Sequence, residues 1–386
     1  MSRGRLFPYL DTNLEESKEL LKSGVTIVDV CPPDVAMELN SGIWDEIEGL
    51  GTGINRNDPK TWGNDTWMQT TKGLVQNQKS GMRKAVCEAR LQCVNPFSKL
   101  FKGLPVNSSF DAISVCRPDS QQRAFKKEVS LNEKYNEGGT LLSSWLHIDQ
   151  ANIKPDCMIH IQGAFALSKL TESEQRTQFV IPKRESTETI QEFRDRFCVA
   201  FPPTLDANGK IADAERAEWV SLALKAKVED TDPIVIAKRK WLIENGEIFT
   251  PTLKPGQMVL WDSGVPHASI PGPLSPGKPT RDVRISTFVS MLPAVLVTDE
   301  ERKVRNNMLD KTVTSGHRVT AIGKSGKPLE SKFVDTGRTY GKVLPEYSYD
   351  SVVRASKRQL EESGDDKRPD SLANKTQRLC AGDGLF

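Results

Sequence analysis

The sequence predicts a mainly β protein with α-helical additions, an α+β fold whose core is a double-stranded β-helix (jelly roll) flanked by N-terminal and C-terminal helices. Short segments with the composition of strands recur through 106–296, and a helix-rich insert at 187–245 interrupts them. Helical patterns precede and follow this stretch. Many short strands in one region are typical of jelly rolls of the cupin type. We therefore expect a single domain over 1–386, made of an N-terminal layer (1–105), the core (106–296) and a C-terminal region of helices and polar tail (297–386).

The N-terminal layer is predicted to hold three helices and one strand. Residues 14–23 have a helical pattern that a glycine ends. The β-branched stretch 25–30 predicts a buried strand. A second helix is expected from Pro33 to Gly49, because proline is favoured in the first helical turn. The spacing of apolar residues at 83–93 predicts the third helix.

The core and the C-terminal region follow from the same two patterns. We expect strands at 110–115, 141–149, 157–167, 178–182, 258–261 and 283–292. We expect helices at 190–197 and 212–226 in the insert, and at 298–309 and 351–362 after the core.

The composition is that of an ordinary globular protein, with 37% hydrophobic and 27% charged residues. No apolar run reaches the length of a transmembrane helix, and the N-terminus lacks the apolar core of a secretory signal, so we expect a cytoplasmic protein with no membrane partner. Seven cysteines without a CxxC pair favour reduced thiols over a disulfide framework. The net charge of +2 disfavours nucleic acid as a partner.

Two short segments carry the residues of a candidate metal site. In Trp145-Leu-His-Ile-Asp149, side chains two positions apart on a strand point to one face, which places His147 beside Asp149. His267 follows a second apolar strand and a tight turn. A His-x-Asp pair alone is a weak signal. Two histidines and one carboxylate around one ion, however, form the facial triad of non-haem Fe(II) oxygenases, which leaves positions open for substrate and oxygen.

A candidate anion site lies on the strand after His267. Arg284 and Ser286 share one face of this strand. An inward guanidinium needs an anionic partner, and arginine grips a carboxylate through two hydrogen bonds. A small dicarboxylate would satisfy Arg284, with Ser286 adding a third bond. An internal Asp or Glu is the alternative partner, and Arg281 is the competing arginine.

Taken together, His147-x-Asp149, His267 and Arg284-x-Ser286 resemble the iron- and 2-oxoglutarate-dependent dioxygenases, and within them the phytanoyl-CoA dioxygenase-like group. Four further stretches support the resemblance: 24–30, 145–150, 161–163 and 255–263. It covers roughly residues 10–300, and it departs from the family's pattern at 171–176 and in the lengthened loop 271–279.

The resemblance implies that His147, Asp149 and His267 bind Fe(II). It also implies that Arg284 and Ser286 hold the distal carboxylate of 2-oxoglutarate. Gln162 would contact the cosubstrate or the substrate.

The implied reaction uses O2 to oxidise a C–H bond, by hydroxylation, desaturation or ring closure, with release of succinate and CO2. Asp149 disfavours halogenation, because its carboxylate occupies the position that a halide would need. A small-molecule substrate is preferred, since the insert can build a lid over a compact pocket. Basic residues suit an anionic, amino-acid-derived or acyl-derived substrate: Lys126, Lys127, Lys183 and Arg184. The oligomeric state is not predicted.

Two alternatives stay open: the same chemistry on a nucleic acid or protein side chain, and a cupin-like binding protein without turnover. The remaining candidates have simpler interpretations. His160 lines the cavity or packs in the core, and His317 is solvated in the polar tail. Asp262 caps the turn before His267, with metal binding as the less favoured alternative. Trp145 and Trp261 pack in the core or wall the site.

Overall fold

The computed structural model describes the greater part of the chain up to residue 319. The described residues are 7–63, 66–67, 74–75, 80–116, 142, 145–149, 160–168, 176–202, 207–208, 220–225, 228–270, 283–310, 317 and 319. Several predicted features lie outside them, among them Arg281, Lys126, Lys127 and the helix at 351–362.

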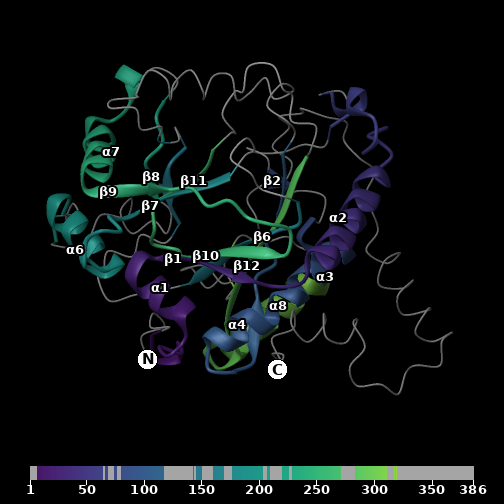
Figure 1. Ribbon diagram of the computed structural model, residues 1–386, viewed down its shortest axis with the longest axis horizontal. Helices are drawn as coiled ribbons and strands as arrows, with labels where there is room; N and C mark the ends of the chain where they lie inside the picture. Colours follow the sequence, from purple (N-terminus) through teal and green to yellow (C-terminus); the bar gives the residue numbers. More distant parts are fainter. Residues whose placement is uncertain are drawn as a thin grey trace.

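Two antiparallel sheets form the centre of the molecule (Figure 1). The larger sheet contains, in spatial order, β1 (Val25–Asp29), β10 (Gln257–Asp262), β6 (Ile161–Ala166), β12 (Arg284–Pro293), β4 (Ile113–Cys116) and β2 (Leu74–Val75), and β3 (Val106–Ser108) pairs with β12. The smaller sheet contains β8 (Val220–Ser221), β5 (His147–Ile148), β11 (His267–Ile270), β7 (Arg176–Pro182) and β9 (Gly246–Phe249).

Helices cover the two sheets in separate groups (Figure 1). One group lies along the larger sheet: α1 (Glu15–Ser23), α2 (Pro33–Glu48), α3 (Lys84–Gln92), α4 (Val94–Leu100) and α8 (Asp299–Asp310). The other lies beside β7 and β9: α6 (Ile190–Ala200) and α7 (Pro233–Asn245). Short 3-10 segments occur at Phe7–Tyr9, Pro59–Trp62, Ser80–Met82, Val228–Asp230 and Ala294–Leu296.

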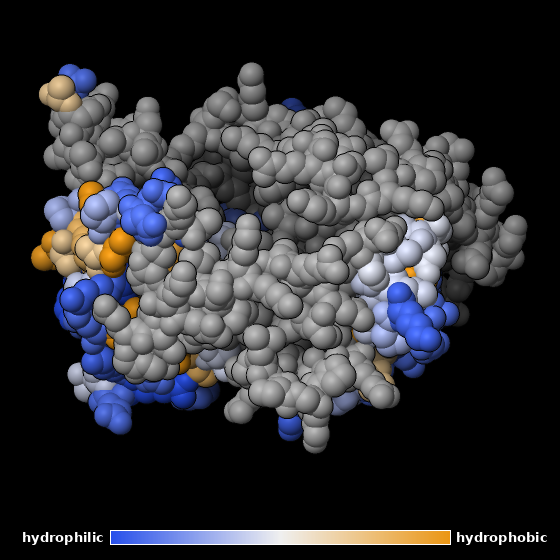
Figure 2. Space-filling model, turned by 90° about the horizontal axis from the view of Figure 1, so that it is seen from above, coloured by the Kyte–Doolittle hydropathy of each residue, from blue (hydrophilic) through white to orange (hydrophobic). Residues whose placement is uncertain are grey.

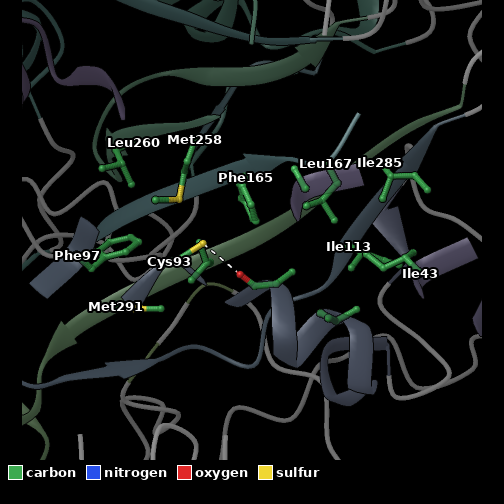
Figure 3. Packing of buried hydrophobic residues seen from close by; sticks show 14 of the residues in the cluster. Ile43, Cys93, Phe97, Ile113, Phe165, Leu167, Met258, Leu260, Ile285 and Met291 are labelled. Carbon is green, nitrogen blue, oxygen red and sulfur yellow. Dashed lines mark hydrogen bonds between the residues drawn. The ribbon is translucent and has the colours of Figure 1, made fainter. Parts of the chain in front are cut away.

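The first hydrophobic core lies between the larger sheet and the helices α1 to α4. Strand β10 shows how the sequence builds it, because Met258 and Leu260 belong to this core whereas Val259, between them, belongs to the second. This is the period of two that a strand imposes. Figure 3 shows Met258 against Cys93 and Phe97 of the helical layer.

The second core fills the space between the two sheets and extends under α6 and α7. Val25, Ala164, Val259 and Trp261 enter it from the larger sheet, and Phe179 enters it from the smaller one. The insert also contributes buried side chains: Ile190, Phe193 and Leu242. Its two described helices are therefore part of the packed interior and not a detached lid.

Most elements expected in the first half agree with the structure, including α1, β1, α2 and α3. Helix α4 was not among the predicted elements; it holds Pro96 in its first turn, where proline is tolerated. The strand expected at 141–149 is wrong in extent: among the described residues of this range (142 and 145–149), Trp145 lies in a turn and His147–Ile148 form the strand. The helix expected at 212–226 is also wrong at its end, since Val220–Ser221 form strand β8.

Some apolar side chains remain on the surface. The most exposed are Met37, Val199, Ile234 and Val295. Figure 2 shows hydrophobic residues on the side where α6 and α7 lie. Within the described ranges, no helix combines the length and the apolar character that crossing a membrane requires.

Gly256 opens strand β10 and offers a test of the packing between this strand and the N-terminal layer. It has a φ of +92°, and a Cβ added there would collide with the carbonyl oxygen of Cys31. Gly51 also has a positive φ, +69°, but a Cβ there would meet nothing within 4 Å. Substitution of Gly51 therefore tests backbone strain alone, whereas substitution of Gly256 tests backbone strain together with a steric collision.

We expect Gly51→Ala to lower the free energy of unfolding by about 1–2 kcal/mol, the usual cost of the left-handed conformation. Gly256→Ala should cost about 1–3 kcal/mol more, because the backbone of Cys31 must also shift. Denaturant unfolding followed by circular dichroism measures both. Equal losses in the two variants would contradict the close approach at Gly256.

Candidate metal centre

The three predicted metal ligands lie together between the two sheets. His147 of β5 pairs directly with His267 of β11, so both imidazoles leave the smaller sheet on the same face. Asp149 follows His147 by two residues and lies just beyond the end of β5. All three residues are buried, with 6–7% of each exposed.

The spacing of their ligand atoms suits a single ion. Nε2 of His267 is 3.2 Å from Oδ2 of Asp149, and Nε2 of His147 is 3.5 Å from Oδ1 of Asp149. One ligand atom from each residue can be chosen so that all lie within 4.8 Å of one another, and the described residues contain this one group of the kind. Ligand atoms about 2.1 Å from an ion and at right angles are roughly 3 Å apart, close to the distances found here.

Both histidines are held with Nε2 directed to the centre. Nδ1 of His147 is 3.0 Å from the carbonyl oxygen of Trp145, and Nδ1 of His267 is 2.9 Å from that of Val265. A carbonyl only accepts, so Nδ1 must carry the proton in each ring. The lone pair then resides on Nε2, the arrangement that outer hydrogen bonds impose on metal-binding histidines.

The ionisation states also suit a metal. Burial, helped by the proximity of His267, lowers the pKa of His147 to about 4, so this imidazole is neutral near pH 7. Burial raises the pKa of Asp149, but its interactions with His317, His147 and His267 outweigh burial and hold this pKa well below the usual value. The site therefore offers a neutral imidazole at His147 and an ionised carboxylate at Asp149, the forms that bind metals.

Gln162 reaches the centre from the facing sheet. It lies on β6, and its Nε2 donates a hydrogen bond of 3.1 Å to Oδ2 of Asp149. Its register partners Trp261 and Ser290 share its inward face. Gln162 was expected to contact a cosubstrate or substrate; its observed partner is the carboxylate of Asp149.

Arg284 and Ser286 lie on the same inward face of the larger sheet. Arg284 pairs with Cys116, and Ser286 pairs with Ser114 and Ala166. Arg284 is 3% exposed and Ser286 is fully buried. The hydroxyl of Ser286 has no hydrogen-bond partner among the residues that the structure describes. A buried hydroxyl of this kind fits a ligand oxygen or nitrogen beside it.

Asp262 positions the turn before His267, as predicted. Its Oδ1 accepts a hydrogen bond of 2.7 Å from the backbone N–H of Gly264, and its Oδ2 accepts one of 2.8 Å from Nη1 of Arg194 on α6. The side chains of Asp262 and Arg194 are 3% and 13% exposed. This buried ion pair fixes helix α6 to the turn that delivers His267.

Aromatic rings surround the two histidines. The centroids of Trp145 and His147 are 4.5 Å apart, and those of Trp261 and His267 are 5.2 Å apart. Phe179 lies 6.2 Å from His267. The two tryptophans therefore wall the site, which was one of the two interpretations of their sequence positions.

Two polar residues beside the site were missed. His317 was expected to be solvated; its Nδ1 instead lies 3.7 Å from Oδ2 of Asp149. Asp111 is 8% exposed, and burial raises its pKa to about 6, with His317 acting in the opposite direction. Neither residue has a sequence signal, because a single histidine or aspartate without a second polar residue at a defined spacing gives no pattern to interpret.

Other predicted candidates lie away from the ligand group. His160 is buried but is not among the residues that could share an ion. Arg184 pairs with Glu247 through Nε at 3.1 Å and stacks 4.3 Å from the ring centroid of Phe249.

Comparison with known proteins gives no family assignment. No protein-family model matches the chain, and no curated protein does. Solved structures with partial likeness include EctD from S. alaskensis with bound Fe (14% identity, 77% of this chain, 85% of that chain, TM-score 0.41). Two others are the non-heme alpha ketoglutarate dependent epimerase SnoN from nogalamycin biosynthesis (13%, 72%, 82%, TM-score 0.35) and CytC3 with Fe(II) and alpha-ketoglutarate (14%, 74%, 79%, TM-score 0.35). At these scores the likeness carries no argument about this chain.

The ion pair between Arg194 and Asp262 gives a testable prediction. Arg194→Ala should lower the free energy of unfolding by about 3–5 kcal/mol, because it leaves a charged Asp262 buried without its partner. Alanine is a good helix former, so helix propensity in α6 does not add to this loss. Lys240→Ala is the control, since Lys240 makes an exposed pair with Glu244 and should cost about 0–1 kcal/mol. Chemical unfolding of both variants measures the change in the free energy of unfolding. Similar losses in the two variants would contradict the prediction.

Proposed function

We propose that this chain is a non-haem iron, 2-oxoglutarate-dependent dioxygenase, of the phytanoyl-CoA dioxygenase-like group, that oxidises a C–H bond of a small metabolite. The observation that carries this proposal is the convergence of His147, Asp149 and His267 from two strands and a turn within the reach of one ion. Two imidazoles and one carboxylate are the donor set of non-haem Fe(II) oxygenases.

The arrangement of the strands supports the proposal. From β4 to β12 the chain passes repeatedly between the sheets: β4, β6, β10 and β12 lie in the larger, and β5, β7, β8, β9 and β11 lie in the smaller, where only β7 to β9 follow one another without a crossing. Two sheets linked in this way, with antiparallel pairing throughout, fit a single jelly-roll domain. The proposed ligands occupy the space between the sheets of such a domain.

The second part of the proposal concerns 2-oxoglutarate. Arg284 and Ser286 face the same interior as Gln162, and Ser286 supplies a buried hydroxyl without a partner in the described part of the chain. Arginine and serine on one face fit the distal carboxylate of a dicarboxylate. Arg281 lies outside the described residues, so Arg284 is the arginine on which we base the proposal.

The residues of this chain would bind and shield the reacting groups. Iron and 2-oxoglutarate, when bound, supply the chemistry that uses O2 to oxidise a C–H bond and releases succinate and CO2. His147, Asp149 and His267 would hold the ion, and Gln162 would orient the carboxylate. Trp145 and Trp261 exclude water beside the histidines.

A small substrate is favoured because the ligand side chains are nearly inaccessible. Each is at least nine-tenths buried, and the described helices of the insert pack into the core beside them. Turnover of a nucleic acid or protein substrate would replace this proposal, and so would ligand binding without turnover.

Removal of either histidine ligand tests the iron site. His147→Ala and His267→Ala should abolish 2-oxoglutarate-dependent succinate release and weaken Fe(II) binding by more than about 100-fold, the upper end of the losses seen for outer partners of metal ligands. The measurements are anaerobic Fe(II) titration and succinate release with candidate metabolites. His160→Gln is the matched control, a buried histidine outside the ligand group that should keep full metal affinity. Iron-dependent turnover at the wild-type rate in either ligand variant would refute the assignment.

A second test addresses the cosubstrate. Arg284→Ala should weaken 2-oxoglutarate binding by about 2–5 kcal/mol, the usual loss on breaking a buried charge pair. This equals roughly 30-fold to a few thousand-fold in Kd. Arg284→Lys keeps the charge but loses the planar fork, so it should fall between the wild type and Arg284→Ala. Calorimetric titration of the metal-loaded protein gives these constants, and an unchanged Kd in Arg284→Ala would move the assignment to Arg281.

A further inference from the structure

A histidine from the segment after α8 flanks the candidate metal ligands. Nδ1 of His317 lies 3.7 Å from Oδ2 of Asp149, and 29% of the His317 side chain is exposed. The same oxygen accepts the hydrogen bond from Nε2 of Gln162 at 3.1 Å. His317 is not part of the group whose ligand atoms all lie within 4.8 Å of one another. It therefore approaches the carboxylate from outside the ligand group, within the distance of an ion pair and slightly beyond that of a hydrogen bond.

A buried arginine of α8 fixes the backbone next to His317. Nη1 of Arg305 donates to the carbonyl oxygen of Val319, and Nη2 donates to that of Ser108 at 2.7 Å. The guanidinium also lies 4.7 Å from the ring centroid of Phe110. Val319 and Arg305 are both 0% exposed. Because Val319 is only two residues from His317, this anchor holds the imidazole beside the site.

The anchor belongs to the core of the molecule. Val319 is part of the first hydrophobic core. Ser108, the other carbonyl bound by Arg305, lies on β3, which pairs with β12. At its beginning, α8 is held by a capping pair, in which the backbone N–H of Thr298 donates to Glu301 at 2.8 Å. A solvated histidine that met Asp149 by chance would not be expected to lie next to backbone that is anchored in the core.

We propose that His317 is a positioning residue of the metal centre, which with Gln162 holds Oδ2 of Asp149 and so orients this carboxylate toward the ion. The inference rests on the proposed function, because it requires that Asp149 binds a metal. Carboxylates that bind metals are themselves held by hydrogen-bond donors, and loss of such a donor typically weakens metal binding about 10–100-fold. The C-terminal region would then contribute directly to the iron site.

The test is metal affinity and does not depend on turnover. Metal-free full-length protein is titrated anaerobically with Fe(II), and in parallel with Mn(II), in a calorimeter. His317→Leu should weaken binding of both ions by about 10–100-fold. His317→Asn should restore most of the affinity, because its amide N–H lies close to the position of Nδ1. His317→Gln places its amide near the position of Nε2 and should restore little.

A double-mutant cycle tests the anchor. Arg305→Lys keeps the charge but cannot donate to two carbonyls in the same geometry, so it should also weaken metal binding. Its effect should largely disappear in a His317→Leu background, since both changes act through one contact. Lys303→Ala, an exposed position on the same helix, is the control and should leave the metal Kd unchanged.

The outcomes separate this inference from the proposed function. If the wild type binds neither ion, the proposed function fails and the inference fails with it. If the wild type binds and His317→Leu binds equally well, the inference alone is overturned. Equal losses in His317→Asn and His317→Leu would also overturn it, because the donor at Nδ1 would then be irrelevant.

Discussion

The pairing of His147 with His267 across two neighbouring strands is the constraint on which the site depends. β5 is only two residues long, so few ladder hydrogen bonds define its register. A shift of one residue would turn His147 to the other face of the sheet and take Asp149 with it. The short strand must therefore be held by contacts outside the sheet.

Arg239 supplies such contacts, and three further buried or partly buried arginines fix neighbouring segments in the same way. Each projects from a helix and donates to a segment that carries a residue of the site: Arg90 to Ser109, Arg194 to Asp262, Arg239 to Leu142 and Leu222, and Arg305 to Ser108 and Val319. The carbonyls bound by Arg239 belong to Leu142, five residues before β5, and to Leu222, directly after β8, so this arginine links the segments next to both strands at that edge of the smaller sheet. A planar guanidinium can bind two carbonyls at once, which makes it suited to fixing loops.

Local sequence patterns predicted much of the fold and some of the residues that surround the metal ligands. The β-branched run at β1 and the proline at the start of α2 are local signals, and both elements formed where expected. His147 and Asp149 were predictable because strand periodicity relates them, and the Gly and Pro residues before His267 indicated a turn. Strands β9 and β11 and the position of His317 in the site could not be predicted from the sequence, because each depends on a partner far along the chain. Gln162 was predicted as a site residue, but its partner Asp149 could be identified only from the facing sheet.

Under the proposed function, the charges of the interior explain why Arg284 can be buried. His147 is neutral near pH 7, because burial and the proximity of His267 lower its pKa, and so it adds no charge. A divalent ion and the guanidinium together contribute three positive charges. Ionised Asp149 and a bound dicarboxylate contribute three negative charges, so the charges of these four groups balance. A buried charge is tolerated when it is compensated nearby. Among these groups, Arg284 thus matches a doubly charged cosubstrate better than a monoanion.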